Sequence, residues 1–586
     1  MEGLEVTVLL GLTILVGTLL APRVRLALPL VLVVLGLLLG FVPALRDVQL
    51  PPETVLLLFL PVMLFWESLT TSLRSIRRDF RYILPMSTLL VVASAFAVAG
   101  IGVLCGMPWE IALILGAAVA PPDATAVAAL GRMLPQRMFM KLKAESLSND
   151  GTALVLYAIA VSIAVGGQVT PLSVTGAVLL SYGGGIVVGV VVAGAAYLLL
   201  RRVSSTMAIN VTLLLVPFTA FLVAEIVEAS GVLAVVVAGL IIAYVSPRVT
   251  TASSRRQTDA VWPFGVYLLN GALFILIGLE VQFVLHEISA AAIGRLALVS
   301  VAIWATLLAV RFLFQLLNTP FQSRSTTIPR GLRSRARVVS TMAGMRGAVS
   351  LAIALSVPST VGFVGGVSGR DAIVFITGGV ILLSLLVQGP LLPAVLRWAR
   401  MPVDHSQDEE LELAERAISG ASLAVIDDLA VEHGVGQEVR DRVREEGYLL
   451  LEYANARALA REQALVDAEA KALDALLDEP DPLAVPGEPS RVEAPLDETG
   501  AAGSTPVIDG VTLQMIATST DVDLLQRSPL IRHAEFTRLK LAMLDHKREV
   551  LLGLRRSGAV DDLIVRRIAA RLDLEQVRLQ GIEEFD

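Results

Sequence analysis

Cysteine is almost absent from this chain, which holds one, Cys105, among its 586 residues. A single cysteine excludes an intramolecular disulfide and a metal site built from several cysteine ligands. Basic residues are missing where a secretory signal would carry them, because the acidic Glu2 and Glu5 precede the first apolar stretch. Residues 401–586 show no glycine-rich nucleotide loop, no cluster of metal ligands and no nucleophile motif. We therefore expect no cofactor, and an enzyme is the least expected class of protein.

Apolar residues, in contrast, are abundant: they make up 55% of the chain and give a mean hydropathy of +0.72. A soluble protein of this length does not reach such a composition, so most of the chain is expected to lie in a lipid bilayer. Charge divides the chain, since residues 1–400 carry 27 Lys and Arg against 16 Asp and Glu, whereas residues 401–586 carry 20 against 38. We predict a transmembrane domain over residues 1–400 and a soluble domain over residues 401–586.

Thirteen apolar runs approach the length that crosses about 30 Å of hydrocarbon. They lie at residues 4–20, 26–42, 54–71, 82–104, 109–131, 145–165, 174–200, 207–228, 230–246, 261–284, 294–318, 336–358 and 371–398. The second run is weak and only a short turn separates the eighth from the ninth, so twelve is the competing count. The sequence predicts an all-α polytopic membrane protein with about 13 (12–13) transmembrane helices.

Positive charges indicate how these spans cross the membrane. Twenty Lys and Arg residues lie in the loops after the odd-numbered spans, whereas the other loops hold only Arg46, Arg295 and Arg370. Because cytoplasmic loops carry the excess of Lys and Arg, thirteen spans leave the N-terminus outside and the C-terminal domain in the cytoplasm. This topology, rather than nucleic-acid binding, accounts for the basic first domain. Spans 1–6 and 8–13 then form two inverted repeats, as in many transporters.

The fifth span, ILGAAVAPPDATAVAAL, contains Pro121 and Pro122 in its middle, followed by Asp123. Two prolines remove two backbone donors and clash with the preceding turn, so we expect this helix to be broken. Irregular backbone at membrane depth persists only where it is buried in protein or lines a water-filled cavity. A simple proline kink, with Asp123 capping its own half-helix, is the alternative.

The twelfth span, STMAGMRGAVSLAIAL, places Arg346 between Gly344 and Gly347. If the two repeats correspond, this span is the counterpart of the fifth, and both are interrupted by residues that weaken a helix beside one charge. A pair of interrupted spans at matching positions is the best sequence indication of a transport site. The glycines could instead serve only to let helices pack closely.

The sixth span carries Glu145, Ser146, Asn149 and Asp150, which share one face of a helix at 100° per residue. Ionisable groups inside a membrane are costly and therefore functional by default, and Glu67 in the third span is a further one. Carboxylate, amide and hydroxyl oxygens suit a small alkali cation or a proton. A buried polar seam between helices is the purely structural alternative.

The stretches APPDATAV, ESLSNDGTALVLY and GMRGAVSLAIAL, in this order and spacing, resemble the monovalent cation:proton antiporter-1 family, the bacterial sodium/proton exchangers of the NhaP type. The resemblance extends over residues 1–400 and includes FLPVMLFWESLTTSLRSIRR and GRDAIVFITGGVILLSLLVQG. It implies the antiporter fold with two broken, crossing helices, and a homodimer.

The resemblance also implies roles for individual residues. Asp150 matches the aspartate where cation and proton compete, Ser146 a side-chain ligand of the cation, and Asp123 the aspartate at the helix crossing. Asn149 matches the electroneutral branch, which implies one-for-one exchange, and Glu67 resembles an acidic residue that contributes to the ion site in some members. The family's buried ion pair corresponds to Glu145 and Arg346. Departures are Pro122, where many members have a threonine, and Ala124, where many have proline.

The acidic second domain shows helical periodicity over residues 405–478 and 511–580. Between them, residues 479–510 are rich in Pro, Gly, Asp and Glu and are predicted to form a flexible linker. Its histidines, His405, His433, His533 and His546, are scattered and are interpreted as solvent-exposed surface residues.

These features together predict a secondary transporter of the cell membrane rather than an enzyme. We expect it to exchange Na⁺, with Li⁺ as a further cargo, for H⁺ by alternating access, in the service of pH and sodium homeostasis. Potassium/proton exchange on the same site is the alternative within transport. A passive cation channel gated by the C-terminal domain is the alternative from another class.

Overall fold

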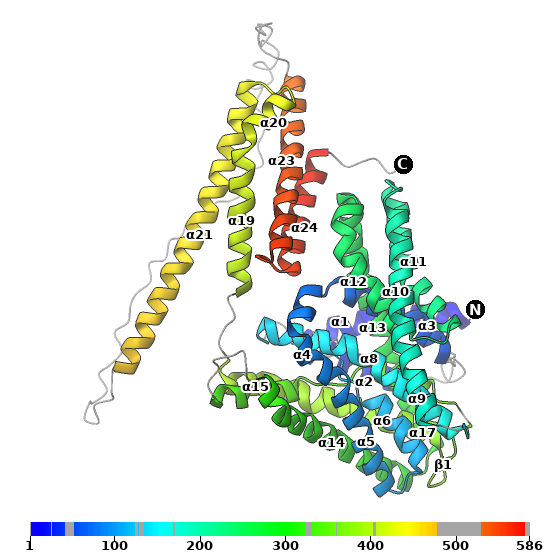
Figure 1. Cartoon of the computed structure of the whole chain (residues 1–586). Coiled ribbons are helices and arrows are strands. Elements are labelled where there is room, and N and C mark those ends of the chain that lie inside the picture. The colour runs from blue at the N-terminus through cyan, green and yellow to red at the C-terminus, as the bar shows by residue number, and fades with distance from the viewer. Residues whose placement is uncertain are drawn as a thin grey trace, which may run out of the picture. The chain divides into compact units, whose positions relative to one another are not determined.

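The computed structural model describes residues 2–24, 26–41, 52–123, 127, 134–167, 170–322, 330–358, 360–401, 406–477 and 529–580. The described chain is mostly helical and divides into two compact units (Figure 1). The first unit comprises Met1–Gln407 and Val560–Val577, and the second comprises Asp408–Ala559 and Arg578–Asp586. Residues 560–577 thus pack with the apolar helices, although they lie in the stretch 401–586 that we predicted as a separate domain. The cytoplasmic location of that stretch stays a prediction.

The first unit is built from many helices and one short β-hairpin. They are α1 (Glu2–Val24), α2 (Leu28–Leu39), α3 (Pro52–Leu69), α4 (Leu73–Ser87), α5 (Leu89–Leu104), α6 (Trp109–Val119), α8 (Gln136–Ala164), α9 (Pro171–Leu179), α10 (Gly185–Leu200), α11 (Thr206–Ile226), α12 (Gly231–Val249), α13 (Ala252–Glu287), α14 (Ala290–Gln322), α15 (Arg330–Met342), α16 (Ala348–Leu355), α17 (Gly369–Leu383), α18 (Gly389–Ala399) and α24 (Asp562–Gln580). Two π-helical turns, η3 (Leu180–Gly184) and η4 (Ser384–Gln388), join α9 to α10 and α17 to α18. The hairpin pairs β1 (Phe363–Val364) with β2 (Val367–Ser368).

Each of the thirteen predicted runs overlaps a helix. Within the described residues, nine helical segments are long and apolar enough to cross a membrane, and shorter apolar helices lie at Leu28–Leu39, Leu57–Leu69 and Trp109–Val119. The structure therefore shows nine candidate spans, and the count of thirteen stays a prediction. Several helices begin before their apolar run: α4 starts at Leu73 rather than 82, and α8 at Gln136 rather than 145. The first turns of α4 and α8 contain Arg, Lys or Gln, so they lie outside the apolar runs although they are helical.

Both predicted interruptions are present in the described chain. Helix α6 ends at Val119, and residues 120–123, which include the two prolines, are not helical. Helix α15 ends at Met342, and α16 begins only at Ala348. The remainder of the fifth predicted run, apart from Val127, lies outside the described residues, as does Ala124.

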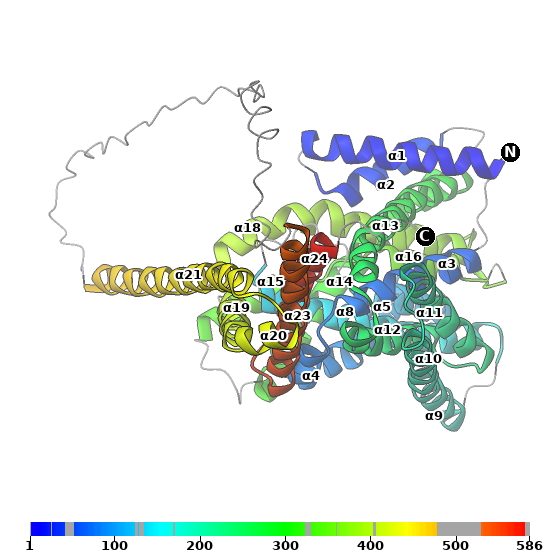
Figure 2. The same cartoon turned by 90° about the horizontal axis from the view of Figure 1, so that it is seen from above.

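The helices of the first unit pack as two groups. Bundle A consists of α1, α2, α3 and α9–α13, in which α2 packs along α13, and α3 against α11 and α12. Figure 2 shows α1 and α2, in blue, beside α13, in green. Bundle B consists of α4, α5, α6, α8 and α14–α18, in which α8 packs on α4 and α6, and α14 on α5 and α17. The bundles meet where α13 and α3 of bundle A contact α16, and where α13 contacts α17.

The second unit contains α19 (Ser406–Ala424), α20 (Ile426–Glu432), α21 (Gln437–Leu477) and α23 (Pro529–Ser557). Its helices enclose a small apolar core that includes Ile426, Val443, Leu539 and Met543. The predicted linker at 479–510 lies outside the described residues.

Candidate functional site

The predicted polar face of α8 is buried inside the first unit. Glu145, Ser146, Asn149 and Asp150 are each at most 4% exposed. Four polar side chains at i, i+1, i+4 and i+5 lie on one side of a helix, so they face the same neighbours. These neighbours are the interrupted segments that follow α6 and α15.

The two interrupted segments cross next to this face. The Asp123 amide donates to the Met345 carbonyl at 2.8 Å, which joins the two breaks directly through their backbones. From α8, the Asn149 side-chain amide donates to the Pro122 carbonyl at 3.0 Å. The backbone groups that the breaks release thus find partners inside the protein, as membrane depth requires. Asp123 itself is buried.

Gly347 explains how Asp123 fits into the crossing. A Cβ atom at this position would overlap the Asp123 carboxylate, so only glycine leaves the room. Gly347 immediately precedes α16, and the Asp123 carboxylate therefore lies at the N-terminal, partially positive end of that helix. The predicted role of Gly347 as a helix interruption holds, and the structure adds that it makes space for a charge.

Asp150 lies within electrostatic reach of two other carboxylates, Asp123 and Glu67. Within the described residues, no hydrogen bond holds the Asp150 carboxylate. Glu67 is half-buried near the end of α3, so the site is shared by both bundles. The structure thus brings together Asp150, Asp123 and Glu67 as the sequence predicts; their part in ion binding stays a prediction.

Lys143 is a further charged residue of this site that sequence reasoning missed. Its Nζ donates to the Thr70 hydroxyl at 2.6 Å, and it lies within electrostatic reach of Glu67. Lys143 is one of the twenty Lys and Arg residues that the sequence analysis places in cytoplasmic loops. The helix begins at Gln136, however, which puts Lys143 two turns before Asp150 on the same face. Counting back seven residues from Asp150 would have identified it.

The predicted ion pair between Glu145 and Arg346 is wrong, because Glu145 pairs with Arg311 of α14. Arg311 Nη1 and Nη2 donate to the two carboxylate oxygens of Glu145 at 2.5 and 3.1 Å. Arg311 is only 1% exposed, and its Nε donates to the Ser340 carbonyl at 3.1 Å. Helix α14 continues to Gln322, and Gln315, four residues after Arg311, is buried on the same face. Arg311 and Gln315, four residues apart in an apolar span, were the sequence signal that indicates a buried polar face on α14.

Arg346 instead stabilises the broken end of α6. Its Nε donates to the Val119 carbonyl at 3.0 Å, and its Nη2 donates to the Ala120 carbonyl at 3.2 Å. A third bond, from Nη1, reaches the Gly344 carbonyl. The last carbonyls of a helix lack intrahelical partners and carry a partial negative charge, which a cation offsets. At the crossing, Asp123 thus offsets the partial positive charge at the N-terminal end of α16, and Arg346 offsets the partial negative charge at the C-terminal end of α6.

The π-helical turn η4 supplies further partners to the second break. The Arg346 amide donates to the Ser384 hydroxyl at 3.4 Å, and the Gln388 side-chain amide donates to the Met342 carbonyl at 3.2 Å. Gly344 leaves room for the Arg311 side chain, since a Cβ at position 344 would lie 2.7 Å from Arg311 Nε. Neither Ser384 nor Gln388 belonged to the predicted site, and a π-turn has no reliable sequence signature.

The first unit also matches known proteins. Residues 11–398 match the family model described as "Sodium/hydrogen exchanger, transmembrane". The chain belongs to the sodium/hydrogen exchanger family. The resemblance inferred from the three motifs is therefore confirmed, and the family together with the nine apolar segments identifies a multi-pass membrane protein of ion transport.

Individual relatives cover most of the chain. An uncharacterized Na(+)/H(+) exchanger of Mycobacterium tuberculosis is 35% identical over 587 aligned residues, which cover 98% of this chain and 96% of the relative. The low-affinity Na(+)/H(+) antiporter NhaS1 of Synechocystis is 30% identical, over 67% of this chain and 73% of the relative. The sodium proton antiporter MjNhaP1 of Methanocaldococcus jannaschii superposes with a TM-score of 0.53 at 18% identity, over 68% of this chain and 98% of that structure. This last likeness indicates a shared fold.

Proposed function

We propose that the protein exchanges Na⁺ for H⁺, and that both ions compete for Asp150. The observation that carries the proposal is a buried carboxylate beside the crossing of two interrupted helices, with Asp123 and Glu67 within electrostatic reach. Carboxylate and hydroxyl oxygens are hard ligands that suit a small alkali cation. Ser146, one turn before Asp150, is the proposed second ligand of the sodium ion. The family and the similarity to the low-affinity Na(+)/H(+) antiporter NhaS1 support the same proposal.

The arrangement of partners supports one-for-one exchange. Both carboxylate oxygens of Glu145 accept hydrogen bonds from Arg311, so we assign Glu145 a structural role and no part in the exchange. Asn149 cannot ionise, and its amide is bonded to Pro122. Asp150 can hold either a proton or a sodium ion, and the net charge of the loaded site is the same in both cases. The exchange that follows is electroneutral.

Alternating access would require one bundle to move against the other. Asp150, Asn149 and Asp123 belong to bundle B, whereas Glu67 lies on α3 of bundle A. We propose that bundle B carries the ion past bundle A and that it moves only when Asp150 is occupied. The protein is proposed to work as a homodimer in the cell membrane, with its N-terminus outside and residues 401–586 in the cytoplasm except where they join the membrane unit.

Replacing Asp150 tests this function directly. Purified wild type and Asp150→Asn are reconstituted into vesicles with an acidic interior, and proton release is followed on addition of Na⁺, Li⁺ or K⁺. We expect wild type to respond to Na⁺ and Asp150→Asn to respond to none of the three. The matched control is Glu225→Gln, which neutralises an exposed carboxylate at the end of α11 and should keep wild-type activity.

Three outcomes would contradict the proposal. Full activity of Asp150→Asn would show that another group carries the proton. A wild-type response to K⁺ with none to Na⁺ would favour potassium/proton exchange on the same site. Cation flux that continues unchanged without any coupled proton movement would favour a channel.

A further inference from the structure

Helix α24 packs against the membrane helices, although about 160 residues separate it in sequence from α18. Its apolar residues Ile564, Val565, Ile568 and Leu572 recur at helical spacing and are all at most 5% exposed. A helix with one buried apolar stripe is amphipathic, and residues 560–577 group with the first unit. The hydrogen bonds and ion pairs of α24 show which helices of the first unit it contacts.

The beginning of α24 binds the beginning of α4. The Ser72 hydroxyl, at the N-cap of α4, lies 3.1 Å from Asp561 Oδ2 and 3.3 Å from Asp562 Oδ2. The Arg74 amide donates to Asp562 Oδ2 at 3.2 Å, and the Ser75 hydroxyl donates to Asp561 Oδ2 at 3.0 Å. Two carboxylates therefore sit at the N-terminal end of α4, where negative charge is favoured.

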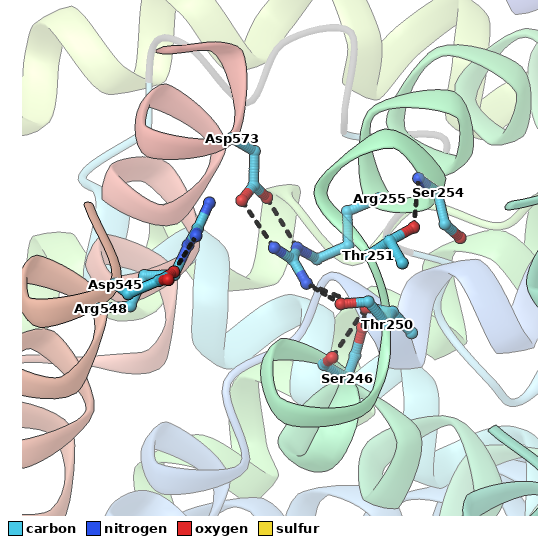
Figure 3. A network of polar contacts seen from close by, with 8 residues as sticks. All are labelled: Ser246, Thr250, Thr251, Ser254, Arg255, Asp545, Arg548 and Asp573. Carbon is cyan, nitrogen blue, oxygen red and sulfur yellow. Dashed lines mark hydrogen bonds and ion pairs between the residues drawn. The ribbon is translucent and has the colours of Figure 1, made fainter. Parts of the chain in front are cut away.

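The later part of α24 binds α13 through a bidentate ion pair, shown in Figure 3. Arg255 Nε and Nη2 donate to the two carboxylate oxygens of Asp573, each at 2.6 Å. The Asp573 side chain is 4% exposed and that of Arg255 is 17% exposed, so solvent screens the pair little. Planar bidentate contacts of this kind fix orientation as well as energy. Arg255 also donates to the Thr250 carbonyl, which ties the pair to the turn between α12 and α13.

These two attachments lie on different bundles. Helix α4 belongs to bundle B, and α13 belongs to bundle A, so α24 fastens one bundle to the other at a single end of the unit. Between the attachments, Arg566 donates to the Thr71 carbonyl at 2.8 Å, at the junction where the chain passes from α3 into α4. The Thr71 hydroxyl donates to the Glu67 carbonyl at 2.6 Å, and the adjacent Thr70 accepts from Lys143. The contacts of α24 therefore reach the turn that carries Glu67.

We propose that α24 restrains the exchange by holding bundle A and bundle B in one relative position, and that releasing it accelerates transport. The inference rests on the proposed function, because it assumes that the bundles move against each other. A helix attached through three carboxylates and two arginines can be released by weakening a few polar contacts. Such a contact acts as an intramolecular brake whose strength equals the free-energy difference between the docked and undocked states.

Loosening the buried ion pair tests the brake in the full-length chain. Asp573→Asn keeps the shape of the side chain but removes the charge that holds Arg255. We expect an initial Na⁺-driven proton flux at least about fivefold above wild type, the lower end of usual coupling effects. The Na⁺ concentration at half-maximal rate should change little, since no ion-site residue is altered. The charge swap Arg255→Asp with Asp573→Arg should return the rate toward wild type.

Cross-linking tests the opposite change. Ser75→Cys and Asp561→Cys are introduced together after the exposed native cysteine is removed by Cys105→Ser. Because the Ser75 hydroxyl and the Asp561 carboxylate are 3.0 Å apart, the two cysteines are placed to form a disulfide under oxidation. Oxidation should slow exchange to about a tenth of the reduced rate, and reduction should restore it.

The matched control is Asp545→Asn, which removes an exposed carboxylate that pairs with Arg548 inside the second unit and should leave the rate unchanged. Thermal unfolding of every variant shows whether it is folded. A folded Asp573→Asn with an unchanged or lower rate, or a cross-linked protein that is as fast as the reduced one, would overturn the brake. If wild type itself showed no Na⁺-dependent proton movement, the proposed function would fail instead.

Discussion

Arg311 and Arg346 have similar chemistry and different roles, and only their surroundings distinguish them. Arg311 neutralises Glu145 with two parallel hydrogen bonds, whereas Arg346 donates to the carbonyls of Val119, Ala120 and Gly344. A cation buried against helix-end carbonyls is stabilised by several partial charges in place of one full charge. A cation buried against one carboxylate depends on that single partner.

A double-mutant cycle separates the two arginines. Arg311→Met should lower the free energy of unfolding by about 3–5 kcal/mol, because Glu145 is left buried without its partner. Adding Glu145→Gln should cost much less than the sum of the two single changes, whereas Arg346→Met and Glu145→Gln should add nearly independently. Thermal unfolding in detergent measures all five variants. Strong coupling between positions 145 and 346, with none between 145 and 311, would contradict the assigned pair.

Sequence reasoning identified the residues of this site but not which side chains pair with each other. Ser146, Asn149 and Asp150 could be placed on one face because helical periodicity is local. The choice between Arg311 and Arg346 as the partner of Glu145 could not be made that way, since it depends on how far α14 and the break before α16 lie from α8. Both arginines are compatible with the spacing, and only the packed structure decides.

At the scale of elements, the crossing of the two interrupted segments depends on small residues more than on proline. The prolines end α6, but Gly344 and Gly347 provide the space that the charged side chains of Arg311 and Asp123 occupy. A glycine in a membrane helix is often explained by close helix packing. Here the closest neighbours of both glycines are charged groups.

Gly347→Ala should therefore be disproportionately harmful. The new methyl group overlaps the Asp123 carboxylate, so we expect a loss of at least about 2 kcal/mol in stability from overpacking and a large loss of exchange. Gly194→Ala on α10 is the matched control, because nothing lies within 4 Å of its added Cβ. That change should be neutral or stabilise by about 0.5–1 kcal/mol, as alanine favours a helix over glycine. Equal tolerance at both positions in unfolding and vesicle assays would show that Asp123 is not confined as described.

The local signals for the two interruptions also explain which helix boundaries sequence reasoning got right. The adjacent Pro121 and Pro122 remove two successive backbone donors, so the end of α6 could be expected within a few residues. The start of α8 could not, because half of the residues from Gln136 to Lys143 are Gln, Arg or Lys, so the segment falls outside the apolar run although it is helical. The position of Lys143 beside the candidate site was missed for the same reason.

At the scale of the whole molecule, the proposed alternating access requires that the two bundles can slide along their interface. Gly378 of α17 and Val281 of α13 face each other across it, and a Cβ at position 378 would lie 3.9 Å from the Val281 Cβ. This spacing suits a disulfide. The interface is apolar and closely packed, so a covalent bond there would fix the relative position of the bundles.

Gly378→Cys with Val281→Cys, in the Cys105→Ser background, should lose exchange on oxidation and regain it on reduction. The control pair Gly185→Cys with Leu233→Cys joins α10 to α12 inside bundle A, where a Cβ at 185 would lie 3.2 Å from the Leu233 Cβ. Oxidation of this pair should leave exchange intact. Vesicle assays before and after oxidation measure both pairs, and undiminished flux through the oxidised Gly378 and Val281 pair would exclude a sliding motion at this interface.

The hydrogen bonds from Arg346 to the carbonyls at the end of α6 also set an order for folding during synthesis. Val119 and Ala120 leave the ribosome more than 220 residues before the arginine that bonds to their carbonyls. Until then the Arg346 guanidinium is not available to these carbonyls, and an unsatisfied carbonyl in hydrocarbon costs several kcal/mol. The crossing of the two interrupted segments can therefore take its final form only after synthesis has passed residue 346, which makes it a late step in the folding of the chain.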